Sequence, residues 1–373
     1  MLSCAHTSDR DQEGQASWLA RRCARPAGSD DVLLHAPNLA FQAPGGGEVQ
    51  LLETGRALEG LGVRPRPFVP WVDRLANARL LHLFGMSREG LALAIAAKAR
   101  GVPVVLSPIC WFEPAAFRCL PTPRARASAW ASYLVRHASP RSPHWRRALL
   151  QTADAILPNS EREAAQLARL FGIEPAKFRV VPNGVDDRFS QARADQFEAQ
   201  FGLRDFVLYV GRVEPRKNVL GLIEALRGGP FPLVVIGDTV PGFEHYGAAC
   251  RARGAGFTRF IPSIEHQDPR LASAYAAARV LALPSWFETP GLAALEAALA
   301  GCRVVVTPLG CTREYFHDLV SYAHPRDPRC LRAAIEREMS RPRQPDLAKW
   351  VRNRYLWTHV ARKTAEVYDD LTP

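Results

Sequence analysis

An acidic pair encloses a turn containing proline and glycine in the C-terminal half of the chain. Glu288 and Glu296 stand on either side of this turn, which follows the apolar run Val280–Leu283. A proline in the first turn of a helix, with a glycine beside it, leaves backbone N–H groups free at the end where the helix dipole is positive. These features predict a seat for a diphosphate at the loop formed by Thr289, Pro290, Gly291 and Leu292.

The spacing of the two carboxylates suits two different sets of hydroxyl groups. Glu288 precedes the expected helix, whereas Glu296 lies about five residues, or roughly 7 Å, further along its axis. One carboxylate could hold the hydroxyls of a sugar and the other those of the ribose in a nucleotide sugar. The alternative for an isolated pair is an ordinary one, in which Glu296 pairs with an arginine and Glu288 is solvated.

A second segment supplies positive charge. The apolar run Phe206–Val210 ends at Gly211 and leads into a loop with Arg212, Arg216 and Lys217. Arg212 could bind a diphosphate through its planar fork and Lys217 through its point charge, while we expect Arg216 to be solvated. Ligands of parallel α/β sheets bind beyond the carboxyl ends of the strands. We therefore expect this segment and the acidic pair to converge on one pyrophosphate, with Arg212, Lys217 and Glu288 as the catalytic groups.

A glycine run in the N-terminal half is a third candidate. Pro44–Gln50 follows the first expected strand and opens an expected helix. Gly46 and Gly47 there would let the backbone approach a ligand closely, and the helix N-terminus would add positive potential. Taken alone, such a run is more often a flexible turn.

Two further side chains are candidates for the sugar or acceptor side of the site. His82 lies on an apolar run expected to be a strand, and Trp111 follows the next such run. For a lone histidine on an apolar strand, the alternative is a hydrogen-bonded residue of the core.

Short apolar runs alternate with segments of helical length along most of the chain, which predicts parallel sheets covered by helices. We expect strands at 32–35, 80–84, 103–106, 155–157, 178–181, 206–210, 233–236, 258–261, 280–283 and 303–306 and helices at 48–61, 88–100, 161–171, 219–226 and 292–300. The fold class is α/β, with two doubly wound Rossmann-like domains that face a cleft. The expected divisions are a loose extension at 1–30, domains at 31–185 and 186–345, and a helical segment at 346–373 that returns to the N-terminal domain as one helix or two.

Composition narrows the class of protein. The chain has 373 residues and a net charge of +11, from 48 Lys and Arg against 37 Asp and Glu, which favours anionic partners. No apolar run reaches the 18 or more residues that cross a bilayer, and no signal-peptide core is present, so we expect a cytoplasmic protein. The eight cysteines form no C-x-x-C pair, and we expect neither disulfides nor bound metal.

Several of these segments together resemble a known family. The shared motifs are Gly211-Arg212 with Lys217-Asn218, Pro182-Asn183-Gly184-Val185-Asp186, Leu283-Pro284-Ser285 and the pair Glu288 and Glu296. They resemble bacterial glycosyltransferases of the GT-B fold, family 4 (group 1). The chain reads Glu-Thr-Pro-Gly-Leu where the family more often has Glu-Gly-Phe-Gly-Leu. It also has Ser107–Trp111 where many members carry a histidine near the sugar.

The resemblance implies a retaining transferase that uses a nucleotide-activated sugar, UDP- or GDP-linked, without metal. It implies diphosphate contacts from Arg212 and Lys217, donor-sugar contact from Glu288 and ribose contact from Glu296. It also implies that Gly46 and Gly47 face the sugar and diphosphate. A glycan or lipid-linked acceptor, in polysaccharide or lipopolysaccharide assembly, follows from the same analogy. The alternative is a non-catalytic GT-B-like scaffold whose basic surface binds an anionic partner. No RNA-binding signature favours nucleic acid.

A basic, aromatic-rich segment over 124–150 adds a possible surface. Arginines and histidines there alternate with Trp130, Tyr133, Leu134 and Trp145. A segment of this kind can rest on an anionic membrane, which predicts a peripheral location on the inner face of the cell membrane. The alternative is that the aromatic rings pack on the N-terminal core and the arginines are solvated.

Overall fold

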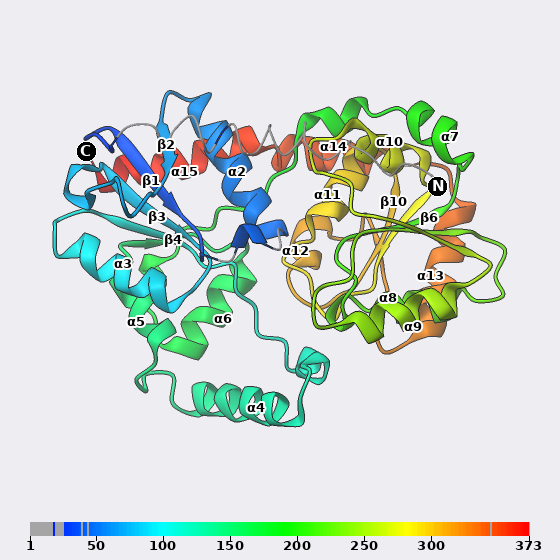
Figure 1. The fold of residues 1–373 in the computed structure, drawn as a ribbon, viewed down its shortest axis with the longest axis horizontal. Helices are drawn as coiled ribbons and strands as arrows, with labels where there is room; N and C mark the ends of the chain where they lie inside the picture. Colours follow the sequence, from blue (N-terminus) through cyan, green and yellow to red (C-terminus); the bar gives the residue numbers. More distant parts are fainter. Residues whose placement is uncertain (1–17, 19–25, 39, 43–44, 344, 373) are drawn as a thin grey trace, which may run out of the picture.

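The computed structural model describes residues 18, 26–38, 40–42, 45–343 and 345–372. It shows two α/β halves side by side, each built on a parallel sheet (Figure 1). Most of the extension expected at 1–30, together with Pro44, lies outside the described residues.

The N-terminal sheet has the strand order β2-β1-β3-β4-β5, the order of a doubly wound fold. Its strands are β1 (Asp31–His35), β2 (Arg64–Pro67), β3 (Leu80–Phe84), β4 (Val104–Ser107) and β5 (Ala155–Ile156). Its helices are α2 (Gly46–Glu59), α3 (Arg88–Lys98), α4 (Pro123–Ala138), α5 (Trp145–Thr152) and α6 (Glu161–Phe171), with a short 3-10 helix η3 (Pro114–Cys119).

The C-terminal sheet has the order β11-β10-β9-β6-β7-β8. Its strands are β6 (Val207–Val210), β7 (Leu233–Ile236), β8 (Thr258–Ile261), β9 (Val280–Leu283), β10 (Arg303–Val306) and β11 (Ser321–Tyr322). Its helices are α7 (Asp195–Phe201), α8 (Val219–Leu226), α9 (Glu244–Gly254), α10 (Pro269–Ala277), α11 (Leu292–Leu299), α12 (Thr312–Phe316) and α13 (Pro328–Ser340), with 3-10 helices η5 (Asp187–Gln191) and η6 (Pro215–Lys217).

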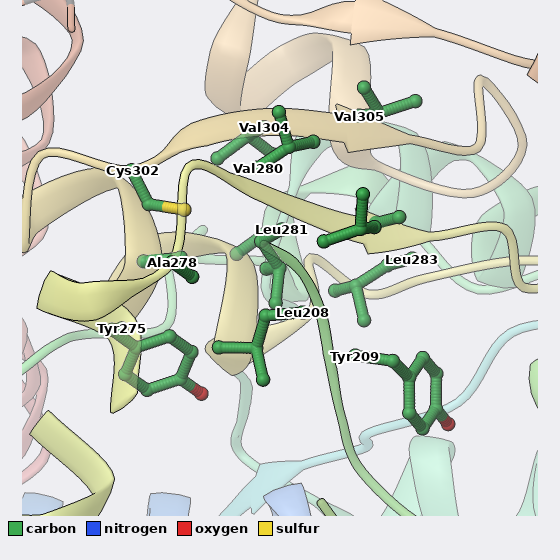
Figure 2. Packing of buried hydrophobic residues seen from close by; sticks show 14 of the residues in the cluster. Leu208, Tyr209, Tyr275, Ala278, Val280, Leu281, Leu283, Cys302, Val304 and Val305 are labelled. Atoms are coloured by element: carbon green, nitrogen blue, oxygen red, sulfur yellow. The ribbon is translucent and has the colours of Figure 1, made fainter. Parts of the chain in front are cut away.

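The central strands of the C-terminal sheet are buried on both faces. Leu208 on β6 pairs with Leu281 on β9, which pairs with Val304 on β10. Figure 2 shows these side chains packed together with Tyr275 from α10 and Cys302. Strands covered on both faces read as continuous apolar runs, which explains why the sequence predicts them well.

Three expectations about the elements were wrong or incomplete. The strand expected at 178–181 is reduced to a single bridge between Phe178 and Ile156. The edge strand β2 was missed because its sequence, Arg-Pro-Arg-Pro, lacks an apolar run; proline is tolerated at a sheet edge. The polar stretch at 186–204, for which no helix was predicted, contains η5 and α7.

The chain crosses between the halves twice, and the two crossings lie side by side. The N–H of Val185 donates to the carbonyl of Tyr355 (2.7 Å), and the N–H of Trp357 donates to the carbonyl of Val185 (3.2 Å). The final segment forms two helices, α14 (Pro345–Arg354) and α15 (Trp357–Leu371). Helix α14 packs on α11 in the C-terminal half, whereas α15 packs on α2 in the N-terminal half.

Gly184 makes this double crossing compact, and we predict that Gly184→Ala destabilises it. An added Cβ would lie 2.5 Å from Cδ2 of Trp357 and 3.0 Å from its Cα. Overpacking of this kind costs about 1–3 kcal/mol, so urea denaturation should show a lower free energy of unfolding. Gly60→Ala is the control, because its Cβ would lie no closer than 3.3 Å to a neighbour and its φ is −61°. Equal stability of both variants would contradict the packing of Trp357 on the linker.

Candidate functional site

The two predicted half-sites meet in a buried ion pair. Lys217 closes η6 after β6, and Glu288 follows β9, the neighbouring strand. The Lys217 ammonium donates to Oε1 of Glu288 at 2.6 Å, and the hydroxyl of Ser285 donates to the same oxygen at 2.6 Å. The side chains are 18% and 6% exposed. The convergence expected from the carboxyl ends of parallel strands is therefore present.

The backbone of Glu288 is held by the loop that follows β10. Its N–H donates to the carbonyl of Leu309 (3.2 Å), and its carbonyl accepts from the N–H of Cys311 (2.9 Å). Between them, Gly310 has a φ of +90°, and a Cβ there would lie 2.1 Å from the Glu288 carbonyl oxygen. Only glycine fits this position. Sequence reasoning missed the loop, although the glycine after a strand was a signal that could have found it.

Charge keeps the Glu288 carboxyl ionised. Burial alone would raise its pKa, but the Lys217 ammonium and the Arg216 guanidinium, with hydrogen bonds from Lys217 and Ser285, hold that pKa below its usual value. Arg216 was expected to be solvated, and this was wrong. Its guanidinium lies 4.9 Å from the centre of the Phe287 ring and bonds to Glu214 (3.0 Å).

Arg212 and the glycine turn of the N-terminal half face each other. Helix α2 begins at Gly46, capped by the side chain of Glu48, which accepts from the N–H of Gly45 (2.7 Å). A Cβ on Gly45 would lie 3.7 Å from the Arg212 guanidinium carbon, and one on Gly46 would lie 3.6 Å from Leu292. The first turn of α2, which holds the candidates Gly46 and Gly47, thus lies against both parts of the C-terminal site.

The helix after Glu288 starts at Leu292, as predicted, but the proline lies outside it. Gly291 is the N-cap of α11, so Pro290 precedes the helix instead of lying in its first turn. The positive φ of Gly291, +90°, brings the chain back over Glu288, whose Oε2 would lie 3.4 Å from an added Cβ. The N-terminus of α11 therefore still lies beside the carboxylate and the ammonium.

Glu296 is held by two side chains that the sequence did not single out. Its Oε1 lies 2.9 Å from Nε2 of His266, and its Oε2 accepts from the hydroxyl of Tyr275 at 2.6 Å. Burial by itself raises the pKa of this carboxyl, but the charge and hydrogen bond of His266 and the bond from Tyr275 hold that pKa below its usual value. Each carboxylate oxygen can accept a further hydrogen bond.

The Glu296 network continues into the N-terminal half. The side-chain amide of Gln267, next to His266, donates to Oε1 of Glu53 on α2 at 2.8 Å. A cavity of about 540 Å³ lies between the halves beside this contact, lined in part by Glu53, Gln267, Asp186 and Trp357. The residues beside Glu296 are thus linked directly to α2.

A second set of bonds joins the halves near Thr289. The carbonyl of Thr289 lies 3.4 Å from the side-chain amide nitrogens of both Asn159 and Asn183. The Tyr315 hydroxyl donates to the carbonyl of Asn159 (2.7 Å) and accepts from the N–H of Asn183 (2.8 Å). The candidate Thr289 therefore touches the N-terminal half through its backbone.

The structure corrects the expectation for His82 and leaves Trp111 between the halves. His82 is 1% exposed, and its ring nitrogens lie 2.6 Å from the Tyr368 hydroxyl and 2.9 Å from the Ser107 hydroxyl. It is a core residue because β3 is covered by α15, and burial lowers its pKa to about 3. Trp111 is partly buried against the core of the C-terminal half, and Arg162 lies over its ring at 5.9 Å.

Among the residues that the structure describes, no group of three or more His, Cys, Asp or Glu side chains could hold a metal ion. The six cysteines in this part of the chain, Cys110, Cys119, Cys250, Cys302, Cys311 and Cys330, are free thiols. Within the same residues, no helix is long and apolar enough to span a membrane.

The buried pair predicts an acid-sensitive stability. Removing one partner of a buried pair costs about 3–5 kcal/mol, so Lys217→Met should lower the free energy of unfolding at pH 7 by roughly that amount. The lowered pKa of Glu288 means that its stabilisation is present above the ordinary carboxyl pKa of 4.5 and is lost as the pH falls through the lowered value. The difference in the free energy of unfolding between wild type and variant should therefore become smaller below pH 4.5.

Urea titrations at pH 7 and below pH 4.5 measure this difference in the free energy of unfolding. Arg193→Met is the control. Arg193 is paired with Asp195 on the surface and is 82% exposed, so its loss should change stability by less than about 1 kcal/mol. A difference for Lys217→Met that does not change with pH would contradict the ionised pair.

Two family profiles match successive parts of the chain. Residues 69–189 match Glycosyltransferase Family 4, and residues 191–357 match Glycosyl transferases group 1. A D-inositol 3-phosphate glycosyltransferase of Nocardioides sp. is 30% identical over 250 residues, which are 59% of this chain and 54% of that protein. The protein of the same name from Kribbella flavida is 36% identical over 181 residues, 43% of this chain and 42% of that one. The chain spans about half the length of the curated relatives it matches.

Solved structures share the whole fold. Sucrose-phosphate synthase of Thermosynechococcus elongatus superposes with a TM-score of 0.71 at 18% identity, over 93% of this chain and 99% of that one. Anabaena HepE, solved with UDP and glucose, has a TM-score of 0.66 at 16% identity, over 91% of this chain and 99% of that one. With its two parallel α/β halves and the convergent motifs after β6 and β9, the chain belongs to the bacterial glycosyltransferases of family 4 (group 1) with the GT-B fold.

Proposed function

We propose that this chain transfers a sugar, with retention of configuration, from a UDP- or GDP-linked donor to a glycan or lipid-linked acceptor in cell-surface polysaccharide or lipopolysaccharide assembly. The observation that carries the proposal is the buried Lys217–Glu288 pair, with Arg212 facing the glycine turn of α2. HepE, whose structures hold UDP and UDP-glucose, supports a nucleotide-sugar donor. The names of the curated relatives make an inositol phosphate the alternative acceptor.

In this proposal the chain's main task is to stabilise the leaving diphosphate. An ammonium has three N–H donors, and Lys217 uses one on Glu288, which leaves two for phosphate oxygens. Arg212 and the N-terminus of α11 add positive charge on the same side. Glu288 accepts from hydroxyls of the donor sugar and Glu296 from the ribose, and a diphosphate oxygen takes the proton of the acceptor hydroxyl. The reaction needs no bound metal.

Binding of a nucleoside diphosphate separates this function from the scaffold alternative. A ligand that binds only the folded state of a protein raises the melting temperature of that protein. UDP or GDP should therefore stabilise the protein more than a single-stranded oligonucleotide of equal charge does. A scaffold that uses its basic surface would show the reverse order, and that result would refute the donor site.

Loss of the two paired side chains should reduce turnover. Removing one preorganised donor to a developing charge commonly costs on the order of 3 kcal/mol, or about a hundredfold in rate. We therefore expect Lys217→Ala and Glu288→Ala each to lower kcat at least about a hundredfold in an assay of UDP or GDP release, with folded protein verified by circular dichroism. Arg193→Ala, a surface cation outside the site, should retain normal turnover. Near-normal rates in both site variants would overturn the assignment.

We further propose that α4 brings the protein to an anionic membrane surface. No residue of α4 is buried, and Trp130, Leu134 and Val135 are 45%, 58% and 48% exposed. The helix projects from the N-terminal half (Figure 1). The expected surface over 124–150 is too long, however, because Leu149 and Leu150 on α5 are fully buried in the core.

Liposome sedimentation tests this surface. The protein should pellet with vesicles that contain anionic lipid and stay in the supernatant with neutral ones, because arginines flank the apolar face. Leu134→Ser with Val135→Ser should abolish pelleting, since the exposed apolar area is lost. Equal recovery of wild type from both kinds of vesicle would discard the proposal.

A further inference from the structure

A cavity of about 360 Å³ lies between α4 and the body of the N-terminal half. Its volume is within the range of about 300–1,000 Å³ that small-molecule sites have. On the helix side it is lined by small residues at helical spacing, Ala125, Ser128, Ala129 and Ser132. Their short side chains leave the space open, while the larger side chains Leu134 and Val135 are on the exposed side.

The rest of the wall is largely aromatic. Phe112, Phe117, Tyr133 and Phe171 line the cavity. The rings of Phe112 and Phe171 lie 5.8 Å apart, and those of Phe117 and Tyr133 lie 5.9 Å apart. Such a wall suits an apolar chain, since its rings offer a large apolar contact area.

Three nitrogenous side chains also line the cavity: Arg136, His144 and Arg146. Burial first, and then the charges of Arg136, Arg146 and Arg88, lower the pKa of His144, so that the imidazole is neutral at pH 7. Among the described residues, Arg88, Arg136 and Arg146 have no carboxylate at ion-pair distance. Cations gathered in this way repel one another unless an anion joins them.

Not every hydrogen-bond donor in this cluster has a partner within the protein. Arg136 donates from Nη1 to the carbonyl of Ser142 (2.9 Å), but its Nε is buried and has no hydrogen-bond partner in the described structure. Nδ1 of His144 accepts from the N–H of Arg146 (3.2 Å), which places the imidazole proton on Nε2. A buried donor without a partner is destabilising, and an acceptor oxygen on a ligand would offset this.

We propose that this pocket binds an anionic amphiphile, with a phosphate group held by Arg136, His144 and Arg146 and an alkyl or isoprenoid chain along the aromatic wall. The arginine charges favour the anionic head group of the ligand, and the aromatic wall favours its alkyl or isoprenoid chain. Phe112 lies next to Trp111, which packs against the C-terminal half, so the pocket adjoins the loop that follows β4. The inference goes beyond donor chemistry and does not depend on the donor site.

Calorimetric titration with dodecyl phosphate, below its micelle concentration and without membranes, tests the proposal. We expect saturable binding with one ligand per chain. Inorganic phosphate and dodecanol, which offer the head or the chain alone, should each bind at least tenfold more weakly. Phosphate that binds as tightly as dodecyl phosphate would show a site for the free ion and overturn the amphiphile, and so would dodecanol that binds equally well.

Matched variants locate the site. Arg136→Gln should weaken binding at least tenfold, whereas Arg124→Gln, on the same helix but outside the pocket, should change it less than twofold. Ala129→Trp should block the cavity, whereas Ala131→Trp adds the same bulk on the exposed side and should bind normally. Equal losses within either pair would overturn the site. Stabilisation by UDP in Arg136→Gln tests the donor site separately, so the two proposals fail independently.

Discussion

The site depends on keeping an ammonium and a carboxylate paired away from water. Burying two charges costs several kcal/mol for each ion, and their attraction repays this only when the geometry is good and further hydrogen bonds are made. Lys217 and Glu288 meet both conditions, because Ser285 adds a bond and the loop after β10 fixes the Glu288 backbone. The loops after β6, β9 and β10 are therefore held in one arrangement before any substrate arrives.

The sequence predicted the parts of this arrangement that depend on local pattern. Strands β7, β9 and β10 were predicted with their observed bounds, because strands buried on both faces are continuous apolar runs. The meeting of Lys217 with Glu288 followed from the common edge at which parallel strands end. By contrast, β2 has no apolar run, and the contact of Arg216 with Phe287 depends on loop conformations that no periodicity reports.

The residues that were misjudged or missed are decided by contacts between distant parts of the chain. His82 is a core residue because Tyr368, 286 positions later, reaches its ring. His266 holds Glu296 and lies beside Gln267, which bonds to Glu53 on the other half. A pattern of residue types along one segment carries no information about such partners, so histidines in particular could be placed only by the structure.

The hydrophobic core of the N-terminal half is completed by α15, the last helix of the described chain. Trp357, Val360 and Tyr368 belong to the same hydrophobic cluster as strands β1 and β3. On the ribosome, the N-terminal sheet emerges first, and α2 covers part of one of its faces early, but the part under α15 stays uncovered until residues 357–371 have been synthesised. The C-terminal half, whose core lies within residues 185–351, can close earlier. The half that is made first is thus the last to be completed, and until then this part of its apolar face is open to chaperones or to aggregation.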